Sequence, residues 1–279
     1  MSRPPGASVG GQAVIEGVLM RAPHGWAVAV RRPDGIIEAR SDELPRLSAR
    51  SRAAKVPLIR GVMVLAESLS LGFRALAWSA TKATDEDEEE IKPRHIAGAM
   101  AVAFVFFVAF FMLLPLLIAS GAEKVLGDSV VLFNVVDGLV RVLLFVGYIW
   151  AIGRSDEIAR VFMYHGAEHK TIHAYEAGDP LAVEAIQKYS PRHPRCGTNF
   201  LLIVILIAIV VFTVIGRPGW FWLVASRVLL IPVIAGLSYE VLKLADAYRW
   251  MSIASRPGIW LQRLTTREPT DDQVEVAIA

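Results

Sequence analysis

Apolar residues form four long runs after residue 95. The runs cover 96–120, 129–153, 199–216 and 220–243. Each is long enough for a helix to cross the hydrocarbon layer of a bilayer. The pattern therefore predicts an α-helical membrane protein with about four transmembrane helices. In the second run, Asp137 and Arg141 are four residues apart, so we expect them to form an ion pair that faces the interior of the bundle.

A different pattern precedes the apolar runs. Residues 10–21 and 26–30 are strand-like, and Asp34-Gly35 separates the second of these from a third strand-like stretch at 36–40. An Asp-Gly pair between two strand-like runs is typical of a β-hairpin. The sequence therefore predicts a small antiparallel sheet over 10–45.

Residues 58–80 have the periodicity of an amphipathic helix. Arg60, Glu67 and Arg74 recur every seven residues and form one charged stripe. Because charge lies at its centre, we expect this helix to lie in the membrane interface or to pack against the bundle, and not to span. The acidic run at 84–90 is typical of a solvated linker.

The chain after the fourth apolar run is predicted to be a helical tail. Residues 244–255 have a helical pattern, and Thr270 can cap a last helix at 271–277. Together the patterns divide the chain into six segments. They are 1–57 (β-rich), 58–95 (amphipathic helix and acidic linker), 96–153 (two spans), 154–198 (His-rich connection), 199–243 (two spans) and 244–279 (helical tail).

Composition agrees with a membrane protein. The 279 residues are 54% hydrophobic, and the mean hydropathy is +0.46, which is above the range of ordinary soluble domains. A net charge of only +2 argues against a nucleic-acid partner, and a single cysteine excludes an internal disulfide. Lys and Arg are concentrated in 154–198 and at both termini, so the positive-inside rule places these parts in the cytoplasm.

Three of the six histidines lie within nine residues, at His165, His169 and His173. On a helix they share one face with Glu168 and Glu176. Residues four apart are separated by about 6 Å along the axis, close enough to bind one metal ion, whereas His165 and His173 are about 12 Å apart. We therefore expect His165 and His169 to bind one divalent metal ion, with His173 next to it or in a neighbouring site.

Other polar residues are candidates to complete this site. His193 and Cys196 form a tight pair just before the third apolar run, in a compartment where the thiol stays reduced. Cys196 and Glu240 are the candidates for a third ligand. Glu16, in the predicted sheet, is expected to lie either on a solvated strand face or near the His-rich helix. Glu16, Glu176 and His193 are also candidates to support the ligands.

Residues 165–169 read His-x-x-Glu-His, the order found in inverted zinc peptidases. In that interpretation the two histidines bind Zn²⁺, with Mn or Fe as alternatives, and Glu168 is the catalytic base. The reaction would be hydrolysis of an amide or ester presented at the bilayer.

Other function classes remain open. One is a non-catalytic assembly protein, in which the histidines hold a structural metal or none and the partner is another membrane complex or a second copy of the chain. A transporter would use the intramembrane charges, but no internal repeat is visible. A lipid desaturase needs more histidines than the six present.

Five stretches of the chain resemble one known family. They are 11–21, 164–173, 193–198, 238–240 and 260–269. Together they are similar to the YqhQ family of bacterial multi-pass membrane proteins, a domain of unknown function labelled as a predicted metal-dependent enzyme. The resemblance covers nearly the whole chain and implies a multi-pass protein of a bacterial cell membrane that binds metal.

Overall fold

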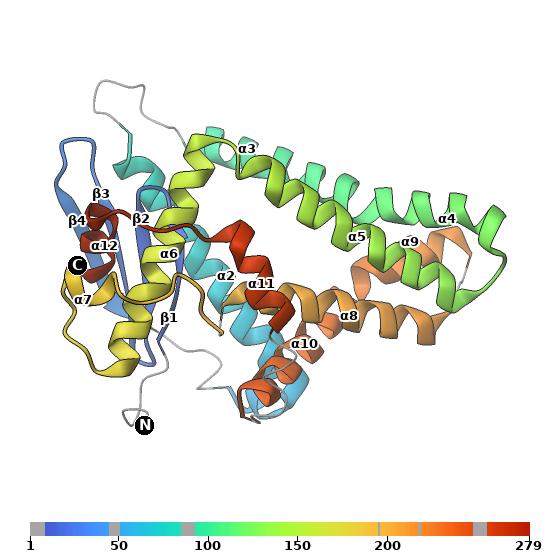
Figure 1. Ribbon diagram of the computed structural model, residues 1–279. Helices are drawn as coiled ribbons and strands as arrows, with labels where there is room; N and C mark the ends of the chain where they lie inside the picture. The colour runs from blue at the N-terminus through green and yellow to red at the C-terminus, as the bar shows by residue number, and fades with distance from the viewer. Residues whose placement is uncertain (1–8, 45–50, 85–92, 195, 217–218, 248–255) are drawn as a thin grey trace.

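The computed structural model describes residues 9–44, 51–84, 93–194, 196–216, 219–247 and 256–279. Two parts are distinguished in Figure 1. One is a compact head built on a β-sheet, and the other is a bundle of long helices that extends away from it. The predicted acidic linker at 84–90 and helix at 244–255 fall mostly outside the described residues.

The predicted antiparallel sheet is confirmed. It has four strands in the order of the chain: β1 (Gly10–Val14), β2 (Gly17–Arg21), β3 (Gly25–Arg31) and β4 (Ile37–Glu43). The Asp34-Gly35 turn joins β3 to β4, with Gly35 at a φ of 84°. The stretch 10–21, which we took as one run, is two strands, because Ile15 and Glu16 form a tight turn in which Glu16 has a φ of 50°.

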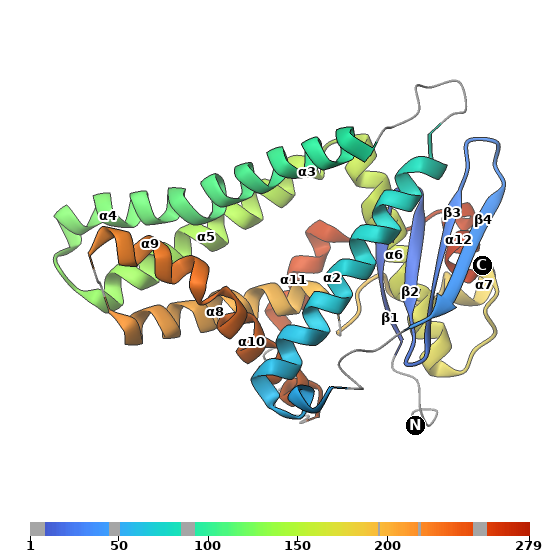
Figure 2. The same ribbon diagram turned by 180° about the vertical axis from the view of Figure 1, so that it is seen from behind.

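Helices cover both faces of the sheet, as Figures 1 and 2 show. α2 (Pro57–Lys82) packs on one face, and α6 (Asp156–Ala177) and α12 (Asp271–Ile278) pack on the other. Alternate residues of a strand point to opposite faces, and two separate cores result. The first core contains Val14, Leu19, Val28, Val30, Leu71 and Ala75. The second contains Val18, Ala29, Tyr164, Ala167, Val274 and Val276.

The bundle contains the predicted membrane helices. The first is continuous through α3 (Pro93–Val108), the π-helical turn η2 (Ala109–Leu113) and α4 (Leu114–Leu126). The second and third are α5 (Val130–Ile152) and α8 (Gly197–Ile215). All three have the length and hydropathy of membrane spans.

The fourth predicted span is broken. It consists of α9 (Trp220–Leu229) and α10 (Ile231–Ala247), which are bent by 46° relative to each other. Pro232 lies directly after the break, and a proline cannot donate the hydrogen bond that would continue the helix.

We expected α2 not to span the membrane, and its length and hydropathy alone would allow it to do so. Two charges of its stripe are paired: Arg60 with Glu240, and Glu67 with Arg21. Four helices among the described residues thus qualify as spans, or five with the bent pair.

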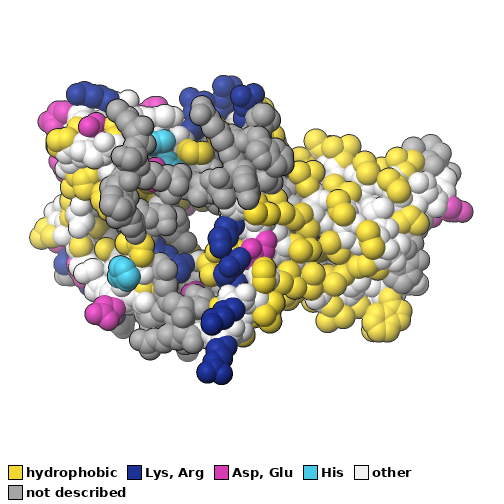
Figure 3. All heavy atoms as spheres, turned by 90° about the horizontal axis from the view of Figure 1, so that it is seen from below, with side chains coloured by type: hydrophobic (Ala, Val, Ile, Leu, Met, Phe, Trp, Pro, Cys, Tyr) yellow, Lys and Arg dark blue, Asp and Glu magenta, His cyan; other side chains and the backbone are white. Residues whose placement is uncertain are grey.

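The surface of the two parts differs in character. Seen from below, the bundle is covered mainly by hydrophobic side chains, whereas the head is mixed, and a row of Lys and Arg side chains lies between them (Figure 3). Val102, Phe104 and Phe221 of the bundle are each about 70% exposed, at 72%, 68% and 73%. Exposed apolar surface of this extent is typical of a protein surrounded by lipid.

Three short helices complete the head and its junction with the bundle. They are η1 (Arg52–Lys55), α7 (Val183–Ile186) and α11 (Arg256–Thr265). Thr270 precedes α12 at the predicted cap position, and its backbone N–H donates to Gln273.

Candidate metal centre

α6 carries the histidine-rich stretch and is a well-terminated helix. Asp156 and Glu157 lie in its first turn, where negative charge is favourable, and Gly178 ends it in a left-handed conformation at φ 77°. Tyr164 and Ala167 on one side of α6 are buried against the sheet. The histidines are therefore held on a rigid element.

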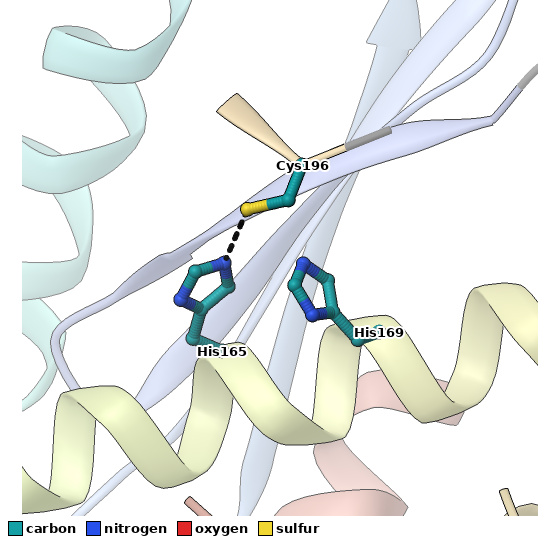
Figure 4. Close-up of side chains that lie close together, drawn as sticks. All are labelled: His165, His169 and Cys196. Atoms are coloured by element: carbon teal, nitrogen blue, oxygen red, sulfur yellow. Dashed lines mark hydrogen bonds between the residues drawn. The ribbon is translucent and has the colours of Figure 1, made fainter. Parts of the chain in front are cut away.

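Three possible ligand atoms converge beside α6. The side chains of His165, His169 and Cys196 each offer one atom within 4.8 Å of the others. Cys196 Sγ lies 3.3 Å from His165 Nε2. Figure 4 shows the two imidazoles side by side on α6, with Cys196 reaching toward them from the start of α8.

Backbone carbonyls fix the tautomer of both imidazoles. His165 Nδ1 lies 2.8 Å from the carbonyl oxygen of Thr265, and His169 Nδ1 lies 2.7 Å from that of Pro191. A carbonyl oxygen can only accept, so each Nδ1 carries the proton and each Nε2 keeps its lone pair. Metal-binding histidines in proteins are oriented in this way.

The donor set fits a zinc ion. In a tetrahedral site with Zn–N near 2.0 Å and Zn–S near 2.3 Å, neighbouring ligand atoms are about 3.3 to 3.6 Å apart. The Sγ to Nε2 distance of 3.3 Å agrees with this spacing. Two imidazoles and one thiol also favour Zn²⁺ over Mg²⁺ or Ca²⁺, which prefer oxygen ligands.

Glu168 lies at the same place and is almost fully buried, with 3% of its surface exposed. Its Oε2 is 3.6 Å from His169 Nε2 and 3.9 Å from His165 Nε2. Burial raises the pKa of the Glu168 carboxyl to about 7, although His165 and the N–H of Gly11 act in the opposite direction. A divalent cation at the three candidate ligands, His165, His169 and Cys196, would favour the ionised carboxylate.

These groups line one cleft of about 480 Å³. The cleft lies between strand β1, helix α6 and the start of α8. Residues of the head and residues of the bundle both contribute, so the cleft opens at the junction of the two parts. Its lining includes Gly11, Ala13, His165, Glu168, His169, Cys196 and Leu201.

The structure brings in residues that the sequence analysis missed. Buried Gln262 holds the backbone of His193 by two hydrogen bonds of 2.8 Å, one to its N–H and one to its carbonyl. Gly166 lies where a Cβ would be 2.0 Å from the carbonyl oxygen of Arg267, so only glycine lets this segment cross α6. A buried glutamine gives no local signal, but the glycine between His165 and Glu168 was visible in the sequence.

His173, one turn further along α6, forms a separate group with His193 of the connection before α8. Their ring centroids are 4.4 Å apart. His173 Nε2 donates to the carbonyl of Arg192 at 2.9 Å, and His193 Nε2 lies 3.4 Å from the carboxylate of Glu176. The rings of His193 and His169 are 5.8 Å apart, so this group lies beside the three candidate ligands and is not one of them.

Glu16 and Glu240 are not part of the group formed by the three candidate ligands. Glu16 accepts a hydrogen bond of 2.7 Å from Arg160 on α6 and one of 3.2 Å from Tyr164. Burial and the negative charge of Glu16 raise the pKa of Tyr164, which keeps its hydroxyl proton to donate. Glu240 on α10 is held by Arg60 of α2, with a 3.2 Å bond to Arg60 Nε.

Asp137 and Arg141 form an ion pair inside the bundle, with two contacts of 3.1 Å. Arg227 of α9 also faces Asp137, at 3.6 Å, and donates to Asn134 at 3.0 Å. Arg141 donates in addition to the carbonyl of Phe111 at 2.7 Å. These contacts join α5 to α9 and to the first membrane helix.

Comparison with known proteins gives the family. A family model described as a protein of unknown function (DUF1385) matches residues 56–279. The uncharacterized protein YqhQ of Bacillus subtilis (strain 168) is 35% identical over 287 residues, covering 96% of this chain and 89% of the relative. No solved structure matches the chain. The chain therefore belongs to the YqhQ family of proteins of unknown function, DUF1385.

Proposed function

We propose that this protein is a metal-dependent hydrolase, with the metal ion held by His165, His169 and Cys196. One observation carries the proposal: three suitable ligand atoms converge in the wall of a cleft, with both histidines already in the metal-binding tautomer. Catalytic zinc sites typically have three protein ligands and a fourth position open to substrate or water.

Each group has a role in this proposal. The metal ion would supply Lewis acidity at neutral pH. Glu168, buried beside both Nε2 atoms, is placed to take a proton from a water molecule in the cleft and to deliver it to the leaving group. The carbonyls of Thr265 and Pro191 hold the imidazoles in position. The substrate class is an amide or ester presented at the membrane surface.

The proposal includes a location. The head, with 154–198 and the C-terminal helices, lies at one end of the bundle (Figure 1). The row of Lys and Arg side chains between the head and the apolar bundle (Figure 3) favours the cytoplasmic face of a bacterial cell membrane. Both termini would then be cytoplasmic, and α2 would lie along the interface with its carboxyl-terminal half on the sheet.

Metal content tests the proposal. The wild-type protein is purified in detergent beside His165→Ala and His169→Ala, and metals are measured by mass spectrometry. About one tightly bound Zn²⁺, Mn²⁺ or Fe per chain is expected in the wild type and a loss in both variants. His24→Ala is the control, because His24 lies in the turn between β2 and β3 and should leave the metal unchanged. A wild-type protein that binds no metal even after reconstitution would contradict the proposal.

Glu168→Gln separates a base from a ligand. As a base, Glu168 is needed for the reaction but not for binding, so Glu168→Gln should keep the metal and lose hydrolytic activity. Loss of the metal in this variant would instead make Glu168 a fourth ligand.

A non-catalytic role in membrane assembly is the second candidate. It is favoured by the position of the cluster, because His165 and His169 hold α6 to α11, to the Pro191 segment and to the start of α8. A metal ion there would strengthen the junction of head and bundle, and the partner would be another membrane protein or a second copy of the chain. X-ray absorption distinguishes the two: an exchangeable oxygen ligand indicates catalysis, and four protein ligands indicate structure.

A further inference from the structure

Strand β1 is an edge strand, because the sheet order is β1-β2-β3-β4. An edge strand has backbone N–H and C=O groups that no neighbouring strand pairs. The register between β1 and β2 determines which residues of β1 point their N–H and C=O groups toward the free edge. Ala13 lies opposite Val18, and Gly11 lies opposite Met20.

Two hydrogen bonds identify the outward-facing residues. The N–H of Arg31 donates to the carbonyl of Glu16. Backbone groups alternate in direction along a strand, so Ala29, two residues before Arg31, also points its N–H and C=O toward β2, where it pairs with Val18. Because antiparallel residues alternate, Val18 then faces away from β1, and Ala13 and Gly11 present their backbone groups at the free edge. The N–H of Gly11 meets the carboxylate of Glu168, as this assignment requires.

The free part of this edge lies in the cleft of the three ligands. Further along, the edge is closed, because the N–H of Ile15 donates to the hydroxyl of Ser79 on α2. Gly11 and Ala13 line the cleft together with His165 and Cys196.

We infer that an extended peptide segment binds in this cleft by adding to β1 as a fifth strand. Its backbone would pair with the carbonyl of Gly11 and with both groups of Ala13, which brings a peptide carbonyl beside Glu168. Apolar side chains on the cleft wall, Val161, Phe162 and Leu201, would contact the peptide's side chains. A lipid acyl chain cannot use the paired N–H and C=O groups of an edge strand.

The inference rests on the proposed function and names its substrate class. In hydrolysis, the C–N bond of the bound peptide breaks, water adds hydroxyl to the carbonyl carbon, and the amine receives the proton. The position of the cleft at the junction of head and bundle favours a peptide segment that lies close to the membrane surface.

Fluorescence anisotropy with two peptide pools tests the inference. One is a fluorescein-labelled octapeptide pool of degenerate sequence, and the other is the same pool with every backbone nitrogen methylated, which removes the N–H groups. The full-length protein in detergent is measured as purified and after chelation, so that binding is read separately from metal content. The unmethylated pool should bind at least ten-fold more tightly. Equal binding of the two pools, or binding of neither, would overturn the inference.

Two proline variants supply a matched pair. Ala13→Pro removes an outward N–H from β1, whereas Ala39→Pro removes one from β4 at the opposite edge, and neither N–H pairs with a neighbouring strand. Only Ala13→Pro should weaken peptide binding, by at least ten-fold. Equal loss in both variants would contradict the inference. If Ala13→Pro does not fold, the comparison of the two peptide pools with the wild-type protein is the deciding test. Absence of metal in the wild type overturns the proposed hydrolase but leaves the peptide comparison readable.

Discussion

His165 donates a hydrogen bond of 2.8 Å to the carbonyl of Thr265, which lies 100 residues later in the chain. Thr265 is the last residue of α11, where helix geometry leaves carbonyl groups without helical partners. The end of one helix thus sets the tautomer and ring orientation of a candidate ligand on another. The approach of the two segments depends on Gly166, beside the carbonyl of Arg267.

Gly166→Ala should disturb this arrangement. The new Cβ would lie 2.0 Å from a backbone oxygen that cannot rotate away, so α6 and the segment at 265–267 must separate. We expect a loss of about 2–4 kcal/mol in stability and a metal affinity weaker by about 10- to 100-fold. Thermal unfolding in detergent and zinc titration measure the two effects. Gly147→Ala on α5 is the control, since nothing lies within 4 Å of its Cβ position. Similar behaviour of the two variants would contradict the prediction.

Gln262→Met should loosen the turn that presents Cys196. The variant keeps the size of the side chain but leaves the N–H and carbonyl of His193 without their 2.8 Å partners. The N–H is then left as one unsatisfied buried group, because the carbonyl has a second donor, and this costs about 1–3 kcal/mol. The same carbonyl of His193 accepts from the N–H of Cys196, so metal affinity should fall as well. Denaturant unfolding and zinc titration check this.

Arg263→Met is the control for that variant. Arg263 is the exposed neighbour of Gln262 on α11, so its replacement should leave stability and metal affinity close to those of the wild type. If the two variants are equally stable, the hydrogen bonds of Gln262 do not hold His193 in place.

The contribution of Arg141 to stability should depend on Pro115, a proline of the first membrane helix. In α-helical register the carbonyl of Phe111 would be bonded by the N–H of residue 115, and proline has none. Arg141 supplies the missing donor at 2.7 Å. In a Pro115→Ala background, Arg141→Met should therefore cost about 1 kcal/mol less than in the wild type. A double-mutant cycle of unfolding in detergent measures the coupling, and a coupling of zero would show that the Phe111 contact is dispensable.

The sheet and three of the membrane helices could be predicted because their signals are local. Asp34-Gly35 marks a hairpin, and the runs within 96–153 and at 199–216 are uninterrupted. The split of the stretch 10–21 was missed, because Glu16 adopts a positive φ that non-glycine residues rarely have. The break between α9 and α10 was also missed, although Pro232 was visible.

The candidate site could be predicted only in part. Helical spacing predicted that His165, Glu168 and His169 share one face of α6. In the structure the Glu168 carboxylate lies within 4 Å of the Nε2 atoms of both histidines. The contact of Thr265 with His165 and that of Gln262 with His193 could not be predicted, because they join residues that are 100 and 69 positions apart in the chain. Composition and periodicity carry no information about such long-range packing.

Cys196 is the single cysteine of the chain, so its reactivity reports the state of the site without ambiguity. A metal-bound thiolate reacts slowly with maleimide, because its lone pairs are engaged. In the wild type, chelation should raise the labelling rate of Cys196 by at least ten-fold, and added Zn²⁺ should reverse this. His169→Ala should label rapidly with or without the chelator, because it lacks one ligand. His24→Ala should behave like the wild type.

The labelling rate must be separated from unfolding, because Cys196 is buried and only 8% exposed. Thermal unfolding followed in the same samples provides this separation: release of metal from a folded site raises the rate well below the unfolding midpoint, whereas global unfolding raises it only at the midpoint. A rate that chelation leaves unchanged, in protein whose thiol labels fully after denaturation, would mean that Cys196 holds no metal. The 3.3 Å contact between its sulfur and His165 Nε2 would then be a thiol–imidazole hydrogen bond.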